Sequence, residues 1–212
     1  MAWFTRFTRF GDVHMVYAQE NECSCGIAAV MMTVFKINEL VPGAQAMYKE
    51  QEVCDVYSDV IGSKYDGTAY TYVDKLATVL NRLNVGTWEA VDIGAVNVPQ
   101  AIVDSVGIEI VGVDPLINEL CQGDPIIILI RWDDGDGHIV VVDTVNSWSG
   151  RLYASVCDPW DGDVHITRFK IGKPFHYEAE ANVFSWDLGG KRHEYKGTRP
   201  GEVKGWVVRK IG

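Results

Sequence analysis

The sequence predicts an α+β fold in which a helical part precedes an antiparallel β part. Up to about residue 85, apolar side chains recur at the three- and four-residue spacing of amphipathic helices. Beyond residue 86 the pattern changes to short β-rich runs that are separated by turn residues. The chain has 212 residues, 47% of them hydrophobic, which suits one domain with a sizeable core. We therefore expect a single domain over 1–212, with a helical lobe at about 15–85, a β lobe at about 86–170 and a cleft between them.

Three helices are expected in the first part. The first opens at Ser24 or Cys25, and its apolar positions are Ile27, Val30, Met31, Val34 and Ile37. The second is predicted from about Ala44 to Tyr57, after Pro42-Gly43, and the third from Tyr70 to Leu83. The glycine-containing stretch 62–67 separates the second helix from the third.

Strands are expected in the second part, at 126–132, 138–145 and 151–157. Turn residues at 133–137 and 146–150 connect them, so that neighbouring strands form antiparallel hairpins. A late strand is predicted around 206–209. The range 171–212 otherwise reads as a basic C-terminal extension.

Charge is unevenly distributed along the chain, whose net charge is −10. Residues 1–169 hold 10 Lys and Arg against 24 Asp and Glu, whereas residues 170–212 hold 9 against 5. An acidic body disfavours nucleic acid and anionic membranes and suits basic peptides. No stretch has the length of a membrane span, and the N-terminus lacks the apolar core of a signal peptide. We expect no membrane insertion.

The five cysteines form no disulfide framework, which favours reduced thiols in a cytosolic environment. Cys23-Ser-Cys25 stands without a second ligand pair, and the aspartates of 133–136 lack the spacing of a calcium loop. We expect no metal and no cofactor.

Cys25 is the predicted nucleophile. A thiol attacks an amide as its thiolate, and the partial positive charge at a helix N-terminus stabilises a thiolate. Gln19, six residues earlier, could donate its amide N–H to the developing oxyanion together with the backbone N–H of Cys25. Cys23 is the competing thiol. The spacing from Gln19 favours Cys25, as does Gly26, which would let a substrate backbone approach closely.

His138 and Asp158 are the predicted imidazole and carboxylate. If 138–145 and 151–157 form a hairpin centred on Trp148, His138 lies directly opposite Asp158, and opposed residues share a face. The carboxylate would then fix the tautomer of the imidazole. Trp160 could cover this pair from water or pack in the core. The other histidines, including His14 and His165, are expected to be structural or exposed, without an acid partner.

Gln, Cys, His and Asp in this order resemble the papain-like cysteine peptidases, most closely the bacteriocin-processing peptidases that cut after a double glycine. Those enzymes carry Gln, five intervening residues and Cys-Gly before a helix, a Gly-x-Pro before a β run, a His that leads an apolar strand, and Asp-Pro. The matching segments are Gln19–Gly26, Gly123–Pro125, His138 with its strand, and Asp158-Pro159. Ser24 stands where the family usually has Asp. The resemblance implies a papain-like fold and cleavage after Gly-Gly; Gly189-Gly190 is a candidate self-cleavage site or an ordinary turn.

Three function classes stay open. The leading one is a cysteine endopeptidase that acts on polypeptides. The second is a cell-wall amidase or transglutaminase-like acyl transferase; Glu22-Cys23-Ser24 is similar to the Asp-Cys-Ser-Gly context of NlpC-type amidases. The third is an inactive binding module.

The segment before Gln19 is too short for a folded pro-region, so we expect control from outside, by a dedicated inhibitor (immunity) protein or by delivery into another cell. A secreted effector or toxin that acts in a recipient's reducing cytosol fits these features. A cytoplasmic enzyme that processes leader peptides is the alternative.

Overall fold

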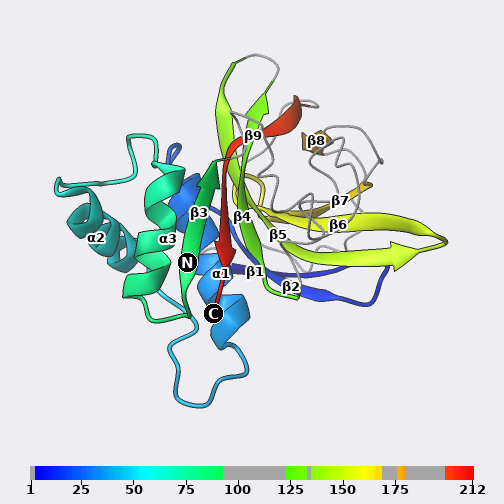
Figure 1. Ribbon diagram of the computed structural model, residues 1–212, viewed down its shortest axis with the longest axis horizontal. Helices are drawn as coiled ribbons and strands as arrows, with labels where there is room; N and C mark the ends of the chain where they lie inside the picture. The colour runs from blue at the N-terminus through cyan, green and yellow to red at the C-terminus, as the bar shows by residue number, and fades with distance from the viewer. Residues whose placement is uncertain (1–2, 93–122, 133–134, 169–175, 180–198) are drawn as a thin grey trace.

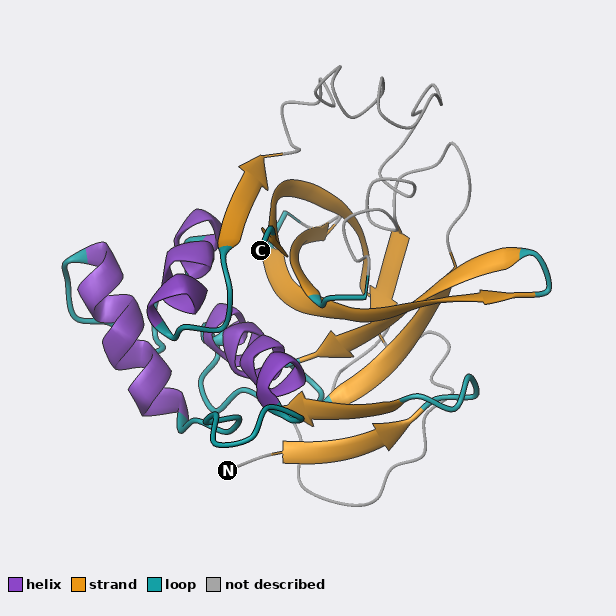
Figure 2. Ribbon diagram, turned by 60° about the horizontal axis from the view of Figure 1, so that its bottom comes forward, coloured by secondary structure: helices purple, strands orange, loops and turns teal. Residues whose placement is uncertain are grey.

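The computed structural model describes residues 3–92, 123–132, 135–168, 176–179 and 199–212, and these form an α+β fold (Figure 1). The elements in chain order are β1 Trp3–Phe7, β2 Val13–Tyr17, α1 Cys25–Asn38, α2 Glu50–Ile61, α3 Val73–Arg82, β3 Trp88–Asp92, β4 Ile126–Trp132, β5 Gly137–Trp148, β6 Arg151–Asp158, β7 Asp163–Arg168, β8 His176–Ala179 and β9 Arg199–Lys210. The helices gather on one side of the molecule and the strands on the other (Figure 2). The predicted order of helices before the large sheet is confirmed, although a small sheet of β1 and β2 precedes them.

Helix α1 begins at Cys25, as predicted, and is the most deeply buried helix. Every residue from Cys25 to Val34 is buried, which is typical of an apolar helix in the centre of a core. Helices α2 and α3 and the large sheet cover it. The N-terminus of α1 is therefore held firmly in place.

Helix α2 begins at Glu50 rather than near Ala44. The Glu52 carboxylate accepts a 2.7 Å hydrogen bond from the backbone N–H of Lys49, and this capping box fixes the start of the helix. Gly62, with φ of 71°, ends the helix in the left-handed conformation. The preceding stretch, 39–49, is mostly exposed, so no burial favours a helix there.

Helix α3 begins at Val73 rather than at Tyr70. The backbone N–H of Tyr72 donates a 2.7 Å hydrogen bond to the hydroxyl of Tyr57 on α2. Tyr72 is consequently held in an extended conformation, with φ of −85° and ψ of 114°, and the helix starts one residue later.

The described strands form two antiparallel sheets. β1 and β2 pair as one hairpin, and the larger sheet has the order β3-β9-β4-β5-β6-β7, with β8 pairing alongside β9. Strand β9 therefore lies inside the sheet, between β3 and β4. The late strand predicted around 206–209 is confirmed and is longer than expected. The end of the range 171–212 thus belongs to the sheet.

The large sheet is buried on both faces. One face packs against the helices through residues such as Ile127, Ile139 and Val141. The other face carries a second apolar cluster that includes Ile128, Val140 and Tyr177. Figure 2 shows the strands of this sheet curving. Burial on both faces explains the unbroken apolar run of β4.

The β5–β6 hairpin has a different register from the predicted one. Trp148 pairs with Arg151 across a two-residue turn, Ser149-Gly150, in which both residues have positive φ. Such a turn matches the twist of a hairpin. A bulge between Val142 and Thr144 shifts the register again. Asp158 consequently lies about two residues along the sheet from the position opposite His138.

No helix within the described ranges combines the length and apolarity needed to cross a bilayer.

Candidate active site

Cys25 occupies the first helical position of α1, directly after the N-cap residue Ser24. The N–H groups of the first turn of a helix have no intrahelical acceptor. They point out of the N-terminal end of the helix, where they can stabilise an anion. Two hydrogen bonds fix Ser24. Its hydroxyl donates to the carbonyl of Asn21 at 3.0 Å, and its own carbonyl accepts from the backbone N–H of Ala28. The Cys25 side chain is buried. The local structure is that expected for an activated thiol.

Gln19 is buried next to this loop, and its amide group faces the loop's own backbone. The Nε2 group donates to the carbonyls of Asn21 at 2.7 Å and Glu22 at 2.9 Å. The backbone N–H of Gln19 donates to the carbonyl of Pro159 at 2.8 Å. Gln19 thus joins the segment before α1 to the turn that follows Asp158. In this arrangement the side chain braces the loop, and its role as an oxyanion donor stays a prediction.

His138 and Asp158 meet, although the predicted register is wrong. His138 Nε2 lies 2.7 Å from Asp158 Oδ1, and both side chains are buried. They sit diagonally on one face of the sheet, because Val141 pairs with Cys157 and Asp158 is one residue further on. Diagonal neighbours in a sheet are close enough for long side chains to touch. The bulge brings the two side chains onto one face, because the register of the Thr144–Trp148 pairs, carried on without it, would place Asp158 opposite Val141, which faces the helices.

The surroundings of this pair favour the charged forms, an imidazolium at His138 and a carboxylate at Asp158. Burial alone would lower the pKa of His138, but the Asp158 carboxylate and a hydrogen-bonding contact with Cys25 raise it to about 10. Burial likewise acts to raise the pKa of Asp158, and the charge of His138 outweighs it and holds that pKa well below its usual range. His138 thus has Asp158 on one side and Cys25 on the other.

Two aromatic side chains that the sequence did not single out complete the surroundings of this pair. The Trp132 ring stacks on the His138 ring, with 5.7 Å between centroids and an interplanar angle of 19°. The Tyr177 hydroxyl donates to Asp158 Oδ2 at 2.6 Å. Trp160, predicted to cover the pair, contacts it through its backbone N–H, which donates to Asp158 Oδ1 at 2.7 Å. Trp132 therefore supplies a stacked ring beside His138, and the covering of the pair by the Trp160 ring stays a prediction.

Gly26 is required for packing within the chain. A Cβ atom at this position would lie 2.2 Å from Thr71 Oγ1 and 3.1 Å from Ile139 Cδ1. The glycine thus allows the segment before α3 and the start of β5 to close over the first turn of α1. Contact of Gly26 with a substrate stays a prediction.

The other described cysteines are poor nucleophiles. Burial, followed by the charges of Cys25 and Glu22, raises the pKa of Cys23. Burial together with nearby acidic groups raises the pKa of Cys54 to about 12 and that of Cys157 well above its usual value. A thiol with a raised pKa is protonated at neutral pH and reacts slowly.

Three buried aspartates lie in the turn between β6 and β7 and at the two strand ends beside it, each next to a buried basic side chain: Asp158 with His138, Asp161 with His165 at 2.8 Å, and Asp163 with Arg6 at 3.2 Å. His165 therefore has an acid partner, which the sequence argument had not placed. Burial and the charge of Asp158 raise the pKa of Asp161, and Asp161 raises that of His165, so this pair retains its proton. Asp158, Asp161 and His165 are close enough to hold a metal ion. Because His138, Trp160 and Tyr177 already occupy the Asp158 carboxylate, and Asp161 and His165 bind one another, we assign Asp161 and His165 a structural role.

A second polar cluster surrounds Asp143, the bulged residue of β5. Its carboxylate contacts His14 Nδ1 on β2 and lies 3.3 Å from Lys36 Nζ at the end of α1, and Cys157 lies beside it. His14 is thus another histidine with an unforeseen acid partner. Burial would raise the pKa of Asp143, but His14 and Lys36 outweigh it and lower that pKa. With an ammonium group already beside the carboxylate, the cluster does not require a metal ion.

Comparison of the sequence with family models finds no match, and comparison with curated proteins finds none either. The functional argument consequently rests on the residues of the site and their contacts.

Proposed function

We propose that this protein is a cysteine peptidase of papain-like fold, with Cys25 as nucleophile, His138 as the proton carrier and Asp158 as its orienting carboxylate. The observation that carries the proposal is the placement of His138. It lies near enough to Cys25, at the N-terminus of α1, for that thiol to help raise its pKa, and it is held by Asp158 at 2.7 Å. This is the arrangement in which a thiol is activated by a base that a third group orients.

The chemistry follows from these positions. The Cys25 thiolate adds to the carbonyl carbon of an amide, and the negative charge passes to the carbonyl oxygen. His138, as imidazolium, gives its proton to the leaving amine as the C–N bond breaks, which leaves an acyl-thioester on Cys25. Neutral His138 then takes a proton from water, whose oxygen attacks the thioester carbonyl. The acid is released and the thiolate–imidazolium pair is restored.

We assign the backbone N–H of Cys25 as the first hydrogen-bond donor to the oxyanion, because helix geometry leaves that group without an intrahelical acceptor. Gln19 could contribute only if its amide released one of its two carbonyl partners. Gln19→Ala and Gln19→Glu separate the two roles. Loss of kcat with an unchanged melting temperature in both variants supports an oxyanion donor, whereas equal losses of stability and activity support a loop brace.

Alkylation and cleavage with matched cysteine variants test the proposal. Iodoacetamide should label Cys25 fastest at neutral pH, and His138→Ala should slow that labelling. Cys25→Ala should abolish cleavage of a peptide library with the fold intact, while Cys23→Ala keeps substantial activity. A dead Cys23→Ala beside an active Cys25→Ala would contradict the assignment of the nucleophile.

Product masses define the substrate class. We expect cut polypeptides, with small residues and above all Gly-Gly on the acyl side of the broken bond, as the family resemblance implies. The candidate self-cleavage site Gly189-Gly190 lies outside the described residues. A cut muropeptide or a new isopeptide bond would instead establish the amidase or the acyl transferase, which use the same thiol and imidazole. A strong preference for a bulky residue beside the bond would refute the small-residue specificity.

The proposed setting is a reducing cytosol, and the proposed role is that of a secreted effector or toxin. The described cysteines Cys23, Cys25, Cys54 and Cys157 are all free thiols, which suits this setting. Expression in a bacterial cytosol tests the role. Growth arrest by the wild type but not by Cys25→Ala supports a toxin. Normal growth in the presence of demonstrably active enzyme contradicts it and favours processing of the producer's own peptides.

A further inference from the structure

Asp158 is held on both of its carboxylate oxygens, and the two oxygens are held by different parts of the chain. Oδ1 accepts from His138 and from the backbone of Trp160, both at 2.7 Å. Oδ2 accepts from the hydroxyl of Tyr177 at 2.6 Å. Tyr177 belongs to β8, in the range that the sequence marked only as a C-terminal extension. Its ring is fully buried.

The position of Tyr177 is fixed by strand β9. Both Tyr177 on β8 and Trp132 on β4 pair with Gly201 of β9. A Cβ atom at Gly201 would lie 2.6 Å from the rings and methyl groups of its neighbours, including Cε3 of Trp132. The missing side chain leaves the space in which the rings of Trp132 and Tyr177 stack, with 5.8 Å between centroids and an interplanar angle of 29°.

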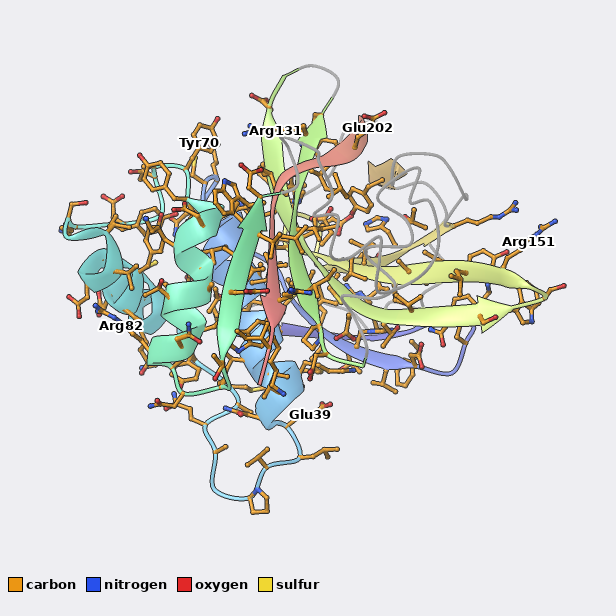
Figure 3. All side chains as sticks on the ribbon, in the orientation of Figure 1. Glu39, Tyr70, Arg82, Arg131, Arg151 and Glu202 are labelled. Atoms are coloured by element: carbon orange, nitrogen blue, oxygen red, sulfur yellow. The ribbon has the colours of Figure 1, made fainter. Side chains whose placement is uncertain are left out.

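The rings of His138, Trp132 and Tyr177 therefore form a continuous row. Trp132 stacks on His138 on one side and on Tyr177 on the other. Arg131 on β4 and Glu202 on β9 are opposite one another in the sheet, and their labels in Figure 3 mark the end of the sheet where this row lies. The row joins the imidazole to the group that holds the second oxygen of its carboxylate partner.

We propose that Tyr177 is a positioning residue for Asp158, so that the C-terminal strands β8 and β9 are a required part of the site. The proposal rests on the proposed function. A carboxylate that is hydrogen-bonded through one oxygen alone can turn about its Cβ–Cγ bond. The hydroxyl of Tyr177 on Oδ2 prevents that rotation and keeps Oδ1 directed at His138 Nε2. Tyr177 thus acts on the proton carrier through Asp158 and does not touch the reacting atoms.

The charges that face Asp158 come from several elements. His138 faces it from β5, His165 from β7, Tyr177 from β8, and Asp161 from the turn before β7. The two imidazoles and the hydroxyl favour the ionised carboxylate, whereas Asp161 opposes it. Removal of the Tyr177 hydroxyl leaves the charges of the histidines and of Asp161 in place. Its effect therefore reports on the hydrogen bond to Oδ2 and on the orientation that this bond gives Asp158.

Tyr177→Phe tests the proposal with NMR titration of His138, whose resonances are assigned by their loss in His138→Ala. The imidazolium should titrate about one pH unit lower than in the wild type, because a freely turning carboxylate stabilises it less. The turnover number should fall about ten-fold while KM stays unchanged. In an Asp158→Asn background the same change should not move the titration further. Tyr177→Phe that titrates like the wild type would overturn the proposal.

Tyr57→Phe is the matched control. Tyr57 is also fully buried, and its hydroxyl also makes one short hydrogen bond, to the backbone N–H of Tyr72 in the helical part. This variant should lose comparable stability and leave the titration of His138 unchanged. A shift of equal size in both variants would show a general loosening and would overturn the positioning role.

Two readouts keep this test separate from the proposed function. The titration of His138 needs no substrate. A shifted titration in a protein that cleaves no peptide would therefore support the positioning role of Tyr177 and refute the proposed peptidase function. The wild type offers a measurement that needs no folded variant. A Tyr177 hydroxyl held by a buried carboxylate should give a slowly exchanging downfield proton resonance that disappears in Asp158→Asn, and its absence in the wild type would overturn the inference.

Discussion

Replacement of Asp158 by asparagine removes one charge while leaving the shape of the site almost unchanged. The asparagine oxygen can take the place of Oδ1, where it still accepts from His138 Nε2 and from the backbone N–H of Trp160. The new NH2 group then faces the Tyr177 hydroxyl, which can turn to accept from it. His138 therefore keeps its tautomer and its direction, and only its electrostatic partner is lost.

The magnitude follows from the loss of a charged acceptor. A hydrogen bond to a charged group contributes about 1.5–3 kcal/mol, roughly twice that of a neutral one. If that difference of about 0.75–1.5 kcal/mol stabilises the imidazolium–thiolate form, the rate at neutral pH should fall about 4- to 13-fold. The alkaline limb of the pH–rate profile should move to lower pH, because the pKa of about 10 at His138 depends on the Asp158 charge. Loss of activity should be milder than in His138→Ala.

Two assays check this reasoning. The rate of Cys25 alkylation by iodoacetamide gives the acid limb, on which the thiolate forms, and kcat/KM for peptide cleavage, measured up to about pH 11, gives the alkaline limb, on which the imidazolium is lost. Peptide cleavage at neutral pH gives the fall in kcat. Complete loss of activity in a folded Asp158→Asn, equal to that of His138→Ala, would refute the reasoning, since it would show that Asp158 does more than orient and charge the imidazole. An unmoved alkaline limb would refute it as well.

Two further variants test the packing around the site. Gly26→Ala should lower the free energy of unfolding by about 1–2 kcal/mol in urea titrations, because the clash with Thr71 exceeds the gain in helix propensity; a stabilised variant would show that Thr71 moves freely. Asp143→Asn should lower it by about 3 kcal/mol at neutral pH, because the partly exposed Lys36 loses its counter-ion and the buried His14 loses its charged hydrogen-bond partner. The folded-state pKa of Asp143 is lowered, so its contribution is present above the usual aspartate pKa and is lost as the pH falls through the folded value. The free energies of unfolding of the wild type and of Asp143→Asn, measured by urea titration, should therefore converge at acidic pH. A difference that stays constant with pH would contradict this explanation.

The elements with strong local patterns were predictable from the sequence. The apolar run after Cys25 predicted the start of α1, because its apolar side chains recur at helical spacing and are buried. The β-branched run 126–132 matches β4 at both ends. Helix α2 was misplaced because the side chain of Glu52 caps the helix at Lys49, a choice that apolar periodicity does not record.

The candidate site was predictable in its residue types and less so in its geometry. Cys25, His138 and Asp158 are brought together, but the argument that joined His138 to Asp158 assumed a hairpin without the bulge at 142–144. The acid partner of His14 was missed because it lies far away in the sequence and is met only through tertiary packing. Asp161 is only four residues from His165, and the turn that brings them together was not foreseen.

By itself the sequence determined which segments form the central helix and strands, and which thiol stands at a helix N-terminus, because local spacing and composition carry that information. Only the tertiary structure decided which groups surround the His138–Asp158 pair. Trp132 and Tyr177 reach it because β9, the last strand of the chain, enters the sheet beside β4 and opposes both residues with Gly201. Such long-range strand pairing depends on the burial of both faces of the sheet at once, and no local pattern around Tyr177 encodes it.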